Sequence, residues 1–316
     1  MKENRNIRLL ISLIILSGAT ILLFLFSNSD HSVVDKNLFR VLDQNSIDHI
    51  VFESPKGKID LKFNGAKWMV NEKYEADAQL VTVFFASILQ AEPKRKLSGA
   101  QQDSVMLRIT KQGVMVSLFQ EQEMMKQFKV VGNELKTESY FQLINDGPYF
   151  ITIPGYRVYV ASIFELSESD WRDKRIFNFN WQNFKTLKAH FPNQPKSDFT
   201  VSLASSLFTI EEVAVADTTK LSSYLESLFN LKAEKLLKAD EAKMYDSLFS
   251  SQPIFQLEIR DIANRSYRLD IFYSKEKDQP IVAIINGEQP IILGSATAAR
   301  IIRQRDFFAL KPSANP

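Results

Sequence analysis

Two stretches of the chain place apolar residues at the same positions. Asp77–Leu97 and Asp217–Leu237 each show an apolar or aromatic side chain 4, 7, 8, 11 and 12 positions after the initial Asp. These positions are Val81, Phe84, Phe85, Ile88 and Leu89 in the first stretch, and Leu221, Tyr224, Leu225, Leu228 and Phe229 in the second. The spacing predicts a helix with one apolar stripe, and Asp is a favourable N-cap. We therefore expect two copies of one structural unit, each built around such a helix.

Alternating apolar and polar positions predict strands around the first helix. They fall at Ile47–Glu53, Lys58–Phe63, Lys67–Val70, Val105–Thr110, Val114–Phe119, Gln127–Val131 and Tyr149–Ile153. Pro93 is expected to end the Asp77 helix, because proline cannot continue the hydrogen-bond ladder. Tyr156–Leu166 is interpreted as a second, shorter helix, and Trp171–Phe177 closes the first unit.

The second half repeats this plan with less regular strands. They are expected at Phe184–Phe191, Asp198–Leu203, Leu207–Ile210, Ile254–Arg260, Tyr267–Tyr273, Ile281–Ile285 and Pro290–Leu293. Further helices are expected at Lys238–Ser250, capped by Asp240, and at Ser295–Arg303. The ending Arg303–Phe308 is interpreted as an echo of Arg172–Phe177, so that Arg303 would correspond to Arg172. The pattern predicts an α+β protein of two tandem similar units, each with antiparallel strands packed on one or two helices.

The N-terminal part carries an uncharged apolar run, residues 9–27. As a helix it would be roughly 28 Å long, close to the ~30 Å hydrocarbon core of a bilayer. Lys2, Arg5 and Arg8 precede it, which predicts a cytoplasmic N-terminus and an exported remainder. The alternative is a cleaved signal peptide, although its apolar region is normally shorter, about 7–15 residues. The expected organisation is therefore a cytoplasmic segment 1–8, a transmembrane helix 9–27, a juxtamembrane linker 28–45, and α+β units 46–180 and 181–316.

The composition excludes several kinds of site and disfavours one class of partner. The net charge of +2 gives no long-range field of one sign, which disfavours nucleic acid as a partner. The chain contains no cysteine, and this excludes disulfides, thiolate metal sites and cysteine nucleophiles. Hydrophobic residues at 45% are typical of a protein with a packed core.

Candidate catalytic and metal-ligating residues are few. The three histidines, His31, His49 and His190, share no ligand spacing, so no metal site is predicted from them. The carboxylate pairs Glu211–Glu212 and Asp240–Glu241 are interpreted as helix-start residues that complement the dipole. No phosphate-binding loop, dinucleotide fingerprint or nucleophile elbow is present in the sequence. The sequence therefore predicts no catalytic residue, no metal and no cofactor.

Two basic clusters and two tryptophans remain as candidate contact residues. Lys94–Lys96 and the arginines Arg300, Arg303 and Arg305 could attract anionic lipid or polymer, but cations at helix ends are expected there as solvated groups. Trp68 and Trp171 are expected to pack in the core rather than to stack on a sugar.

The run Asn64–Val70, followed by Tyr74, Asp77 and the apolar helix, resembles the bacterial domain-of-unknown-function family 4340. Trp171–Phe177 is similar to the closing motif of that family, and the likeness extends over roughly residues 45–310, although the second copy lacks the tryptophan. The resemblance implies one N-terminal membrane segment and a repeated α+β envelope domain. It also implies genes near ABC-transporter components of the kind tied to gliding motility in Bacteroidota, and it supplies no active site.

These observations lead to three functional hypotheses. The first is a single-pass bacterial inner-membrane protein whose periplasmic units bind or scaffold a partner, as an auxiliary of an ABC-type transporter or envelope complex. Its partner would be another inner-membrane protein such as a transporter permease, and its lipid contact would be residues 9–27. The second is an envelope enzyme acting on glycan or peptide. The third is a solute-binding component, which would need a deep polar cleft.

Overall fold

The computed structural model describes residues 13–21 and 34–310, except 42, 178, 180–181, 205–206 and 274–278. The first described segment, residues 13–21, is helical and exposed along its whole length. Among the described residues, no helix combines the length and the apolar character needed to cross a bilayer. Residues 9–12 and 22–27 of the predicted transmembrane segment lie outside the described residues.

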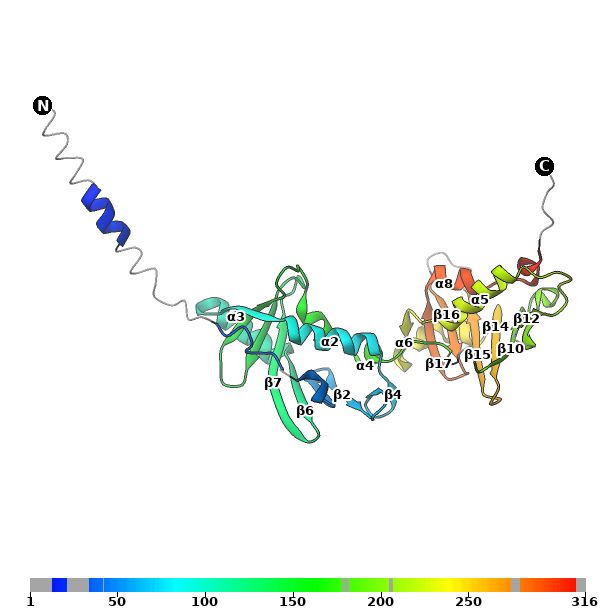
Figure 1. The fold of residues 1–316 in the computed structure, drawn as a ribbon, viewed down its shortest axis with the longest axis horizontal. Coiled ribbons are helices and arrows are strands. Elements are labelled where there is room, and N and C mark those ends of the chain that lie inside the picture. Colours follow the sequence, from blue (N-terminus) through cyan, green and yellow to red (C-terminus); the bar gives the residue numbers. More distant parts are fainter. Residues whose placement is uncertain are drawn as a thin grey trace, which may run out of the picture. The chain divides into compact units, whose positions relative to one another are not determined.

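The first sheet has nine strands in the order β4-β3-β2-β1-β6-β7-β8-β9-β5 (Figure 1). Its strands are β1 His49–Ser54, β2 Gly57–Phe63, β3 Trp68–Val70, β4 Tyr74–Glu75, β5 Glu92–Lys96, β6 Val114–Gln120, β7 Glu123–Gly132, β8 Ser139–Leu143 and β9 Pro148–Thr152. The helices of this part of the chain are η1 Gln44–Ser46, α2 Ala78–Gln90, α3 Gly99–Gln112, η2 Val160–Phe164 and α4 Glu168–Trp171.

The second sheet has eight strands in the order β12-β11-β10-β14-β15-β16-β17-β13. They are β10 Phe184–His190, β11 Phe199–Ala204, β12 Leu207–Ile210, β13 Lys235–Leu236, β14 Phe255–Asp261, β15 Ser266–Phe272, β16 Ile281–Ile285 and β17 Gln289–Leu293. The helices of this part are η3 Pro195–Ser197, α5 Thr218–Phe229, α6 Ala239–Ala242, η4 Lys243–Tyr245, α7 Asp246–Phe249, α8 Ser295–Ile301 and η5 Arg305–Phe308.

The two sheets have the same topology. If the edge strand β4 is left out, strands β3, β2 and β1 of the first sheet correspond to β12, β11 and β10 of the second. Strands β5–β9 then correspond to β13–β17 in chain order. Helix α2 lies between β4 and β5, and helix α5 lies between β12 and β13, so the two helices are topologically equivalent. The neighbouring strands with assigned registers pair antiparallel, as predicted. The predicted α+β fold of two similar units is confirmed at the level of topology.

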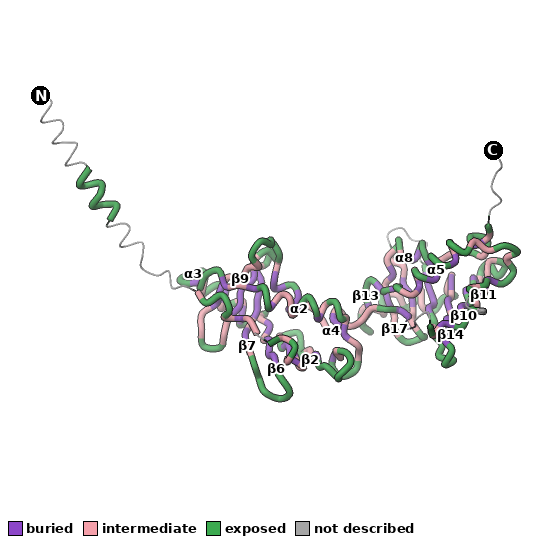
Figure 2. Tube along the Cα trace, in the orientation of Figure 1, coloured by how far each residue is buried: buried purple, intermediate pink, exposed green. Residues whose placement is uncertain are grey.

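The apolar stripes of α2 and α5 face the cores, as the spacing predicts. Phe84 is fully buried and its ring contacts Phe52 and Phe164 at centroid distances of 5.4 and 5.6 Å. In α5, Leu225 is fully buried and the Tyr224 hydroxyl donates to the Ile301 carbonyl at 3.0 Å. Figure 2 shows the buried positions concentrated on the sheets and on one side of these helices.

One position of the predicted apolar stripe is not buried, contrary to the expectation. Leu89, in the last turn of α2, is 47% exposed.

A hydrogen bond closes each copy. The Asp77 backbone N–H donates to the Trp171 carbonyl, and the Asp217 N–H donates to the Phe308 carbonyl, each at 2.8 Å. An isolated β-bridge lies next to each of these bonds, between Ala76 and Arg172 in the first copy and between Ala216 and Ala309 in the second. The equivalent of Trp171 is therefore Phe308. The predicted alignment of Arg172–Phe177 with Arg303–Phe308 is wrong, since it rested on similar residue types and not on backbone position.

Helix α3 replaces the predicted strand Val105–Thr110. Its buried residues Val105 and Ile109 are four positions apart, one helical turn, while Leu107 between them is 58% exposed. With Leu97 and Tyr140 they form a small core on the second side of the first sheet. The β-branched residues suggested a strand, but burial at i and i+4 favours a helix.

Three other expectations are also corrected. Pro93 lies in edge strand β5, after α2 has ended at Gln90, so residues 94–96 are strand and not helix end. The expected Lys238–Ser250 helix consists of three short pieces, α6, η4 and α7, and the N-cap of α6 is Lys238 instead of Asp240. The expected Tyr156–Leu166 helix is reduced to the 3₁₀ turn η2, because Tyr156 forms a bridge with Ile153.

The described residues group into two compact units. The first contains the described residues up to Asp60 together with Thr82–Glu165, and the second contains Leu61–Val81 together with the described residues from Leu166 onward.

Candidate functional site

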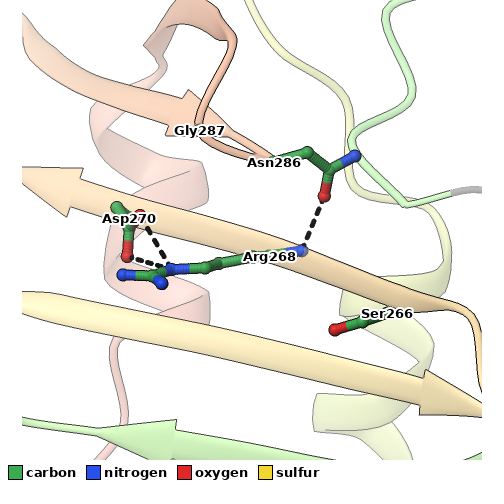
Figure 3. A pocket seen from close by; sticks show the side chains of 5 residues that line it. All are labelled: Ser266, Arg268, Asp270, Asn286 and Gly287. Carbon is green, nitrogen blue, oxygen red and sulfur yellow. Dashed lines mark hydrogen bonds and ion pairs between the residues drawn. The ribbon is translucent and has the colours of Figure 1, made fainter.

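A shallow polar depression of about 430 Å³ lies on the side of the second sheet that faces away from α5 (Figure 3). Ser266, Arg268 and Asp270 line it from alternate positions of β15, and Asn286 and Gly287 line it from the turn between β16 and β17. Alternation along a strand explains why three polar residues share one face. The positive φ angles of Asn286 (51°) and Gly287 (76°) fit the tight turn that the sequence signals.

Asp270 organises this depression. Its carboxylate accepts from Arg268 Nε at 3.0 Å and from Gln256 Nε2 at 2.6 Å, and the residue is only 8% exposed. The Arg268 backbone N–H donates to the Asn286 side-chain oxygen at 2.8 Å. Since Asp270 is satisfied by two donors, its function in the site is to hold the Arg268 side chain.

The serine of this depression contacts a carboxylate of lowered pKa. The Ser266 hydroxyl donates to Glu258 Oε1 at 3.1 Å, and Arg260 Nε contacts the same oxygen at 2.7 Å. The Arg260 hydrogen bond lowers the pKa of Glu258 against the opposing effect of burial. A carboxylate with a lowered pKa is a weaker base, so Glu258 is poorly suited to deprotonate the hydroxyl.

A second depression, about 370 Å³, contains His190, Asp198 and Arg305. His190 Nδ1 lies 2.6 Å from Asp198 Oδ2, and Asp198 Oδ1 accepts from the Phe191 N–H at 2.7 Å. Both bonds span the turn between β10 and β11, which gives the pair a role in fixing that turn. Arg305 binds Glu212 and also donates to the Lys196 carbonyl at 2.8 Å.

The other predicted candidates are dispersed. His49 Nε2 lies 2.9 Å from Asp60 Oδ2, and the His49 ring stacks on Phe119 at 5.0 Å; His31 lies outside the described residues. Among the described residues, no group of three or more His, Asp or Glu side chains is arranged to hold a metal ion.

The two carboxylate pairs lie in different kinds of local structure. Glu211 and Glu212 follow β12 in a turn and do not begin a helix, contrary to the expectation. Asp240 and Glu241 lie in the first turn of α6 as expected. The hydrogen bond from Lys235 lowers the pKa of Glu241.

The basic clusters are largely engaged within the protein. Lys96 binds Asp146, Arg95 donates to Gln101 at 2.9 Å, and the Arg303 guanidinium lies 4.7 Å from the centre of the Phe307 ring.

The tryptophans differ in burial. Trp171 is fully buried, as expected for a core residue, whereas Trp68 is half-buried with its ring 5.8 Å from Phe63.

Sequence reasoning missed the Tyr159 network. The Tyr159 hydroxyl donates to Glu165, and burial raises the pKa of that tyrosine. Its ring lies directly on Gly132, where a Cβ atom would be 1.6 Å from the hydroxyl oxygen. The isolated Gly132 at the end of an alternating strand was the available signal, because such a glycine often marks a close approach.

Comparison with known families decides the affiliation. A family model described as "Domain of unknown function (DUF4340)" matches residues 68–247, more than half of the chain. The chain belongs to this family. The match begins at β3 and ends in α7, so it is shorter than the expected 45–310. Searches among curated proteins and solved structures gave no match.

Proposed function

We propose that this DUF4340 protein is a membrane-anchored periplasmic binding or scaffolding subunit, held in the bacterial inner membrane by residues 9–27. The observation that carries the proposal is the exposure of the helix at 13–21. Leu13, Ile14, Ile15, Leu16 and Ile21 are each 59–70% exposed. An uncharged helix that exposes five large apolar side chains is favoured by a nonpolar environment, and a bilayer supplies it. Lys2, Arg5 and Arg8 orient the N-terminus toward the cytoplasm.

A binding role, without catalysis, is supported by how the polar groups are used. The Ser266 hydroxyl contacts a carboxylate of lowered pKa, and the imidazole of His190 fixes a turn through Asp198. The two depressions of the second sheet are shallow and lined by side chains that mostly satisfy one another. Two units of the same topology offer two related surfaces to a partner, and the anchor raises the effective concentration of both at the membrane.

The proposed partner is another inner-membrane protein, such as the permease of an ABC-type transporter. The test is affinity purification of the detergent-extracted full chain, with mass spectrometry of what co-purifies. A reporter fused after Ser27 should lie outside the cytoplasm while the chain stays in the membrane fraction. Replacing residues 9–27 by an unrelated membrane helix should weaken the association and leave the folded units intact. Hydrolysis of cell-wall glycan or peptide by the purified chain, abolished by one carboxylate substitution, would show the proposal to be wrong.

A further inference from the structure

Two arginines of the second sheet are held by carboxylates that are less exposed than they are. Arg260 Nε donates to Glu258 Oε1 at 2.7 Å, and Arg268 Nε lies 3.0 and 2.9 Å from the two carboxylate oxygens of Asp270. The arginine side chains are 54% and 55% exposed, whereas those of Glu258 and Asp270 are 32% and 11% exposed. Both guanidinium groups are therefore fixed in place and presented to solvent.

Both arginines lie on one face of β14 and β15. Leu257 and Ile259 of β14 and Leu269 of β15 are fully buried in the core to which α5 contributes. Successive side chains of a strand point to opposite faces, so Arg260 and Arg268 share the other face, which carries the depression of Figure 3. A ligand that approaches this face meets both guanidinium groups.

The strand register sets the spacing of the two guanidinium groups. Arg260 is bound at Glu258, two positions away along β14, and Glu258 is opposite Arg268 in the ladder. Arg268 is bound at Asp270, two positions further along β15. The two groups are therefore offset by two residues along the strands, which corresponds to about 7 Å.

The hydrogen-bond acceptors of this face are used within the protein. Besides its arginine, Asp270 accepts from Gln256 Nε2 at 2.6 Å, and Glu258 accepts from the Ser266 hydroxyl at 3.1 Å. The Asn286 side-chain oxygen accepts from a backbone N–H of β15 at 2.8 Å. These groups leave little capacity to bind the donors of a ligand.

Donors on the same face remain available. Among the described residues, none accepts from the terminal Nη groups of Arg260 or Arg268, or from Asn286 Nδ2. Figure 3 shows the Asn286 nitrogen directed away from the bond that its oxygen makes. Remaining donors together with positive charge fit a ligand with anionic oxygen atoms, and a guanidinium fork matches a carboxylate in particular.

We propose that this face of β14 and β15 binds an extended acidic segment of the partner protein, whose carboxylates at alternate positions contact Arg260 and Arg268. The inference rests on the binding role in the proposed function and adds the chemistry of the partner's contact segment. In an extended chain, side chains two residues apart point to the same side and repeat at about 7 Å. This repeat matches the offset of the two guanidinium groups.

The charge of the face is complementary to such a segment. The exposed Lys188 of β10 is opposite Glu258, so three cations surround the two carboxylates Glu258 and Asp270. Because the carboxylates are the less exposed groups, an approaching anion meets the cations first. Binding should therefore weaken as the salt concentration rises.

The test uses the detergent-extracted full chain and a fluorescent synthetic peptide in which glutamate alternates with serine. Arg260→Lys and Arg268→Lys each keep the positive charge but lose the guanidinium fork. Each should weaken binding, measured by fluorescence anisotropy, roughly three- to tenfold. Circular dichroism shows that each variant is folded.

Arg265→Lys is the matched control. Arg265 Nε also binds a carboxylate, that of Asp261 at 2.6 Å, and its side chain is 60% exposed. Asp261, however, occupies a core-facing position of β14, so this pair does not belong to the proposed face. The peptide should bind Arg265→Lys as tightly as the wild type.

The outcomes are distinct. An equal loss of affinity in all three variants, or no loss at Arg260 and Arg268, would overturn the inference. Equal binding of a peptide with glutamine in place of glutamate, or of one with its glutamates adjacent, would do the same. Tighter binding of polyphosphate or of a uronic-acid polymer through the same arginines would assign the face to another polyanion, which also overturns it.

Affinity purification separates this inference from the proposed function. The double variant Arg260→Lys with Arg268→Lys should lose the inner-membrane partner that the wild-type chain retains. A partner retained by the double variant would overturn the acidic contact and leave the proposed function intact. Absence of any co-purifying protein with the wild-type chain would instead contradict the proposed function.

Discussion

The backbone N–H of Asp77 donates to the carbonyl oxygen of Trp171 at 2.8 Å, and the pair Asp217 and Phe308 repeats this bond at the same distance. In each pair the first residue precedes a core helix, and the second is a fully buried aromatic residue. Each copy of the repeat is thus closed at the start of its helix. Replacement of the tryptophan by phenylalanine keeps the closure because the bond uses the main chain, and both rings can fill the core.

The first prediction concerns this closure. Phe308→Ala should destabilise the second unit by roughly 3–5 kcal/mol, since it removes a fully buried aromatic ring whose neighbours include Tyr224 and Phe199. The adjacent Phe307→Ala is the matched control, because Phe307 is 37% exposed. Urea unfolding monitored by circular dichroism measures both. Equal effects of the two substitutions would contradict the assignment of Phe308 as the closing residue.

The core helices could be predicted because their signal is local. A stripe of apolar residues at helical spacing after an Asp predicts both the helix and the face that it buries. Phe84 and Leu225 are buried, as the stripe predicts. Leu89 shows the limit of this reasoning. The pattern records that a residue is apolar, but whether another element covers it depends on tertiary structure.

Several strands could not be predicted for the same reason. β8 follows a turn at 133–138 and has the buried run Ser139–Phe141 without alternation, so its sequence lacks a period-2 signal. β5 contains Pro93, which is tolerated only because β5 is an edge strand. Edge position depends on the complete strand order, and single segments do not contain that information.

The polar sites are also non-local. Asp270 and Gln256 lie on different strands and meet only through the register of β14 and β15. The same holds for Gly132 and Tyr159, which lie in segments separated by two strands, β8 and β9. No spacing rule within one segment reports such pairs, whereas the Asn286–Gly287 turn was recognisable because its geometry is encoded by two adjacent residues.

The second prediction tests the buried stripes. Phe84→Ala and Leu225→Ala should each cost about 2–5 kcal/mol, because both side chains are fully buried and truncation leaves a cavity. Leu89→Ala should change the free energy of unfolding by less than about 1 kcal/mol, since its side chain is 47% exposed. Chemical denaturation of the purified variants provides the values. A loss at Leu89 as large as that at Phe84 would mean that another element covers the outer side of α2.

The third prediction concerns the contact between Gly132 and Tyr159. Gly132→Ala should destabilise the first unit by roughly 1–3 kcal/mol, because the new methyl group would occupy the position of the tyrosine hydroxyl. In the double variant with Tyr159→Ala, the additional cost of the alanine at 132 should largely disappear. Tyr159→Phe alone measures the loss of the hydroxyl bond to Glu165, and with Gly132→Ala its ring carbons would still lie 2.4 and 2.6 Å from the new Cβ atom. Additive costs in the double-mutant cycle would show that the two residues do not share this space.

The last prediction uses the acid group at the turn between β8 and β9. Lys96 lowers the pKa of Asp146 through a direct ion pair that outweighs burial, and the Tyr149 hydroxyl adds a hydrogen bond of 2.7 Å. A folded-state pKa below the unfolded value of about 3.9 stabilises the fold at any pH above that value. Asp146→Asn should therefore lower the free energy of unfolding by about 1 kcal/mol at neutral pH.

The difference between wild type and Asp146→Asn should shrink as the pH falls below about 3.9 toward the lower pKa of the folded state, where the carboxyl is protonated in both states. Asp103→Asn on the exposed side of α3 is the matched control for the substitution itself. Unfolding curves at a series of pH values measure both variants. A constant difference between wild type and Asp146→Asn from neutral pH down to acid would mean that Asp146 acts through its shape and hydrogen bonds, which the asparagine retains, and not through its charge.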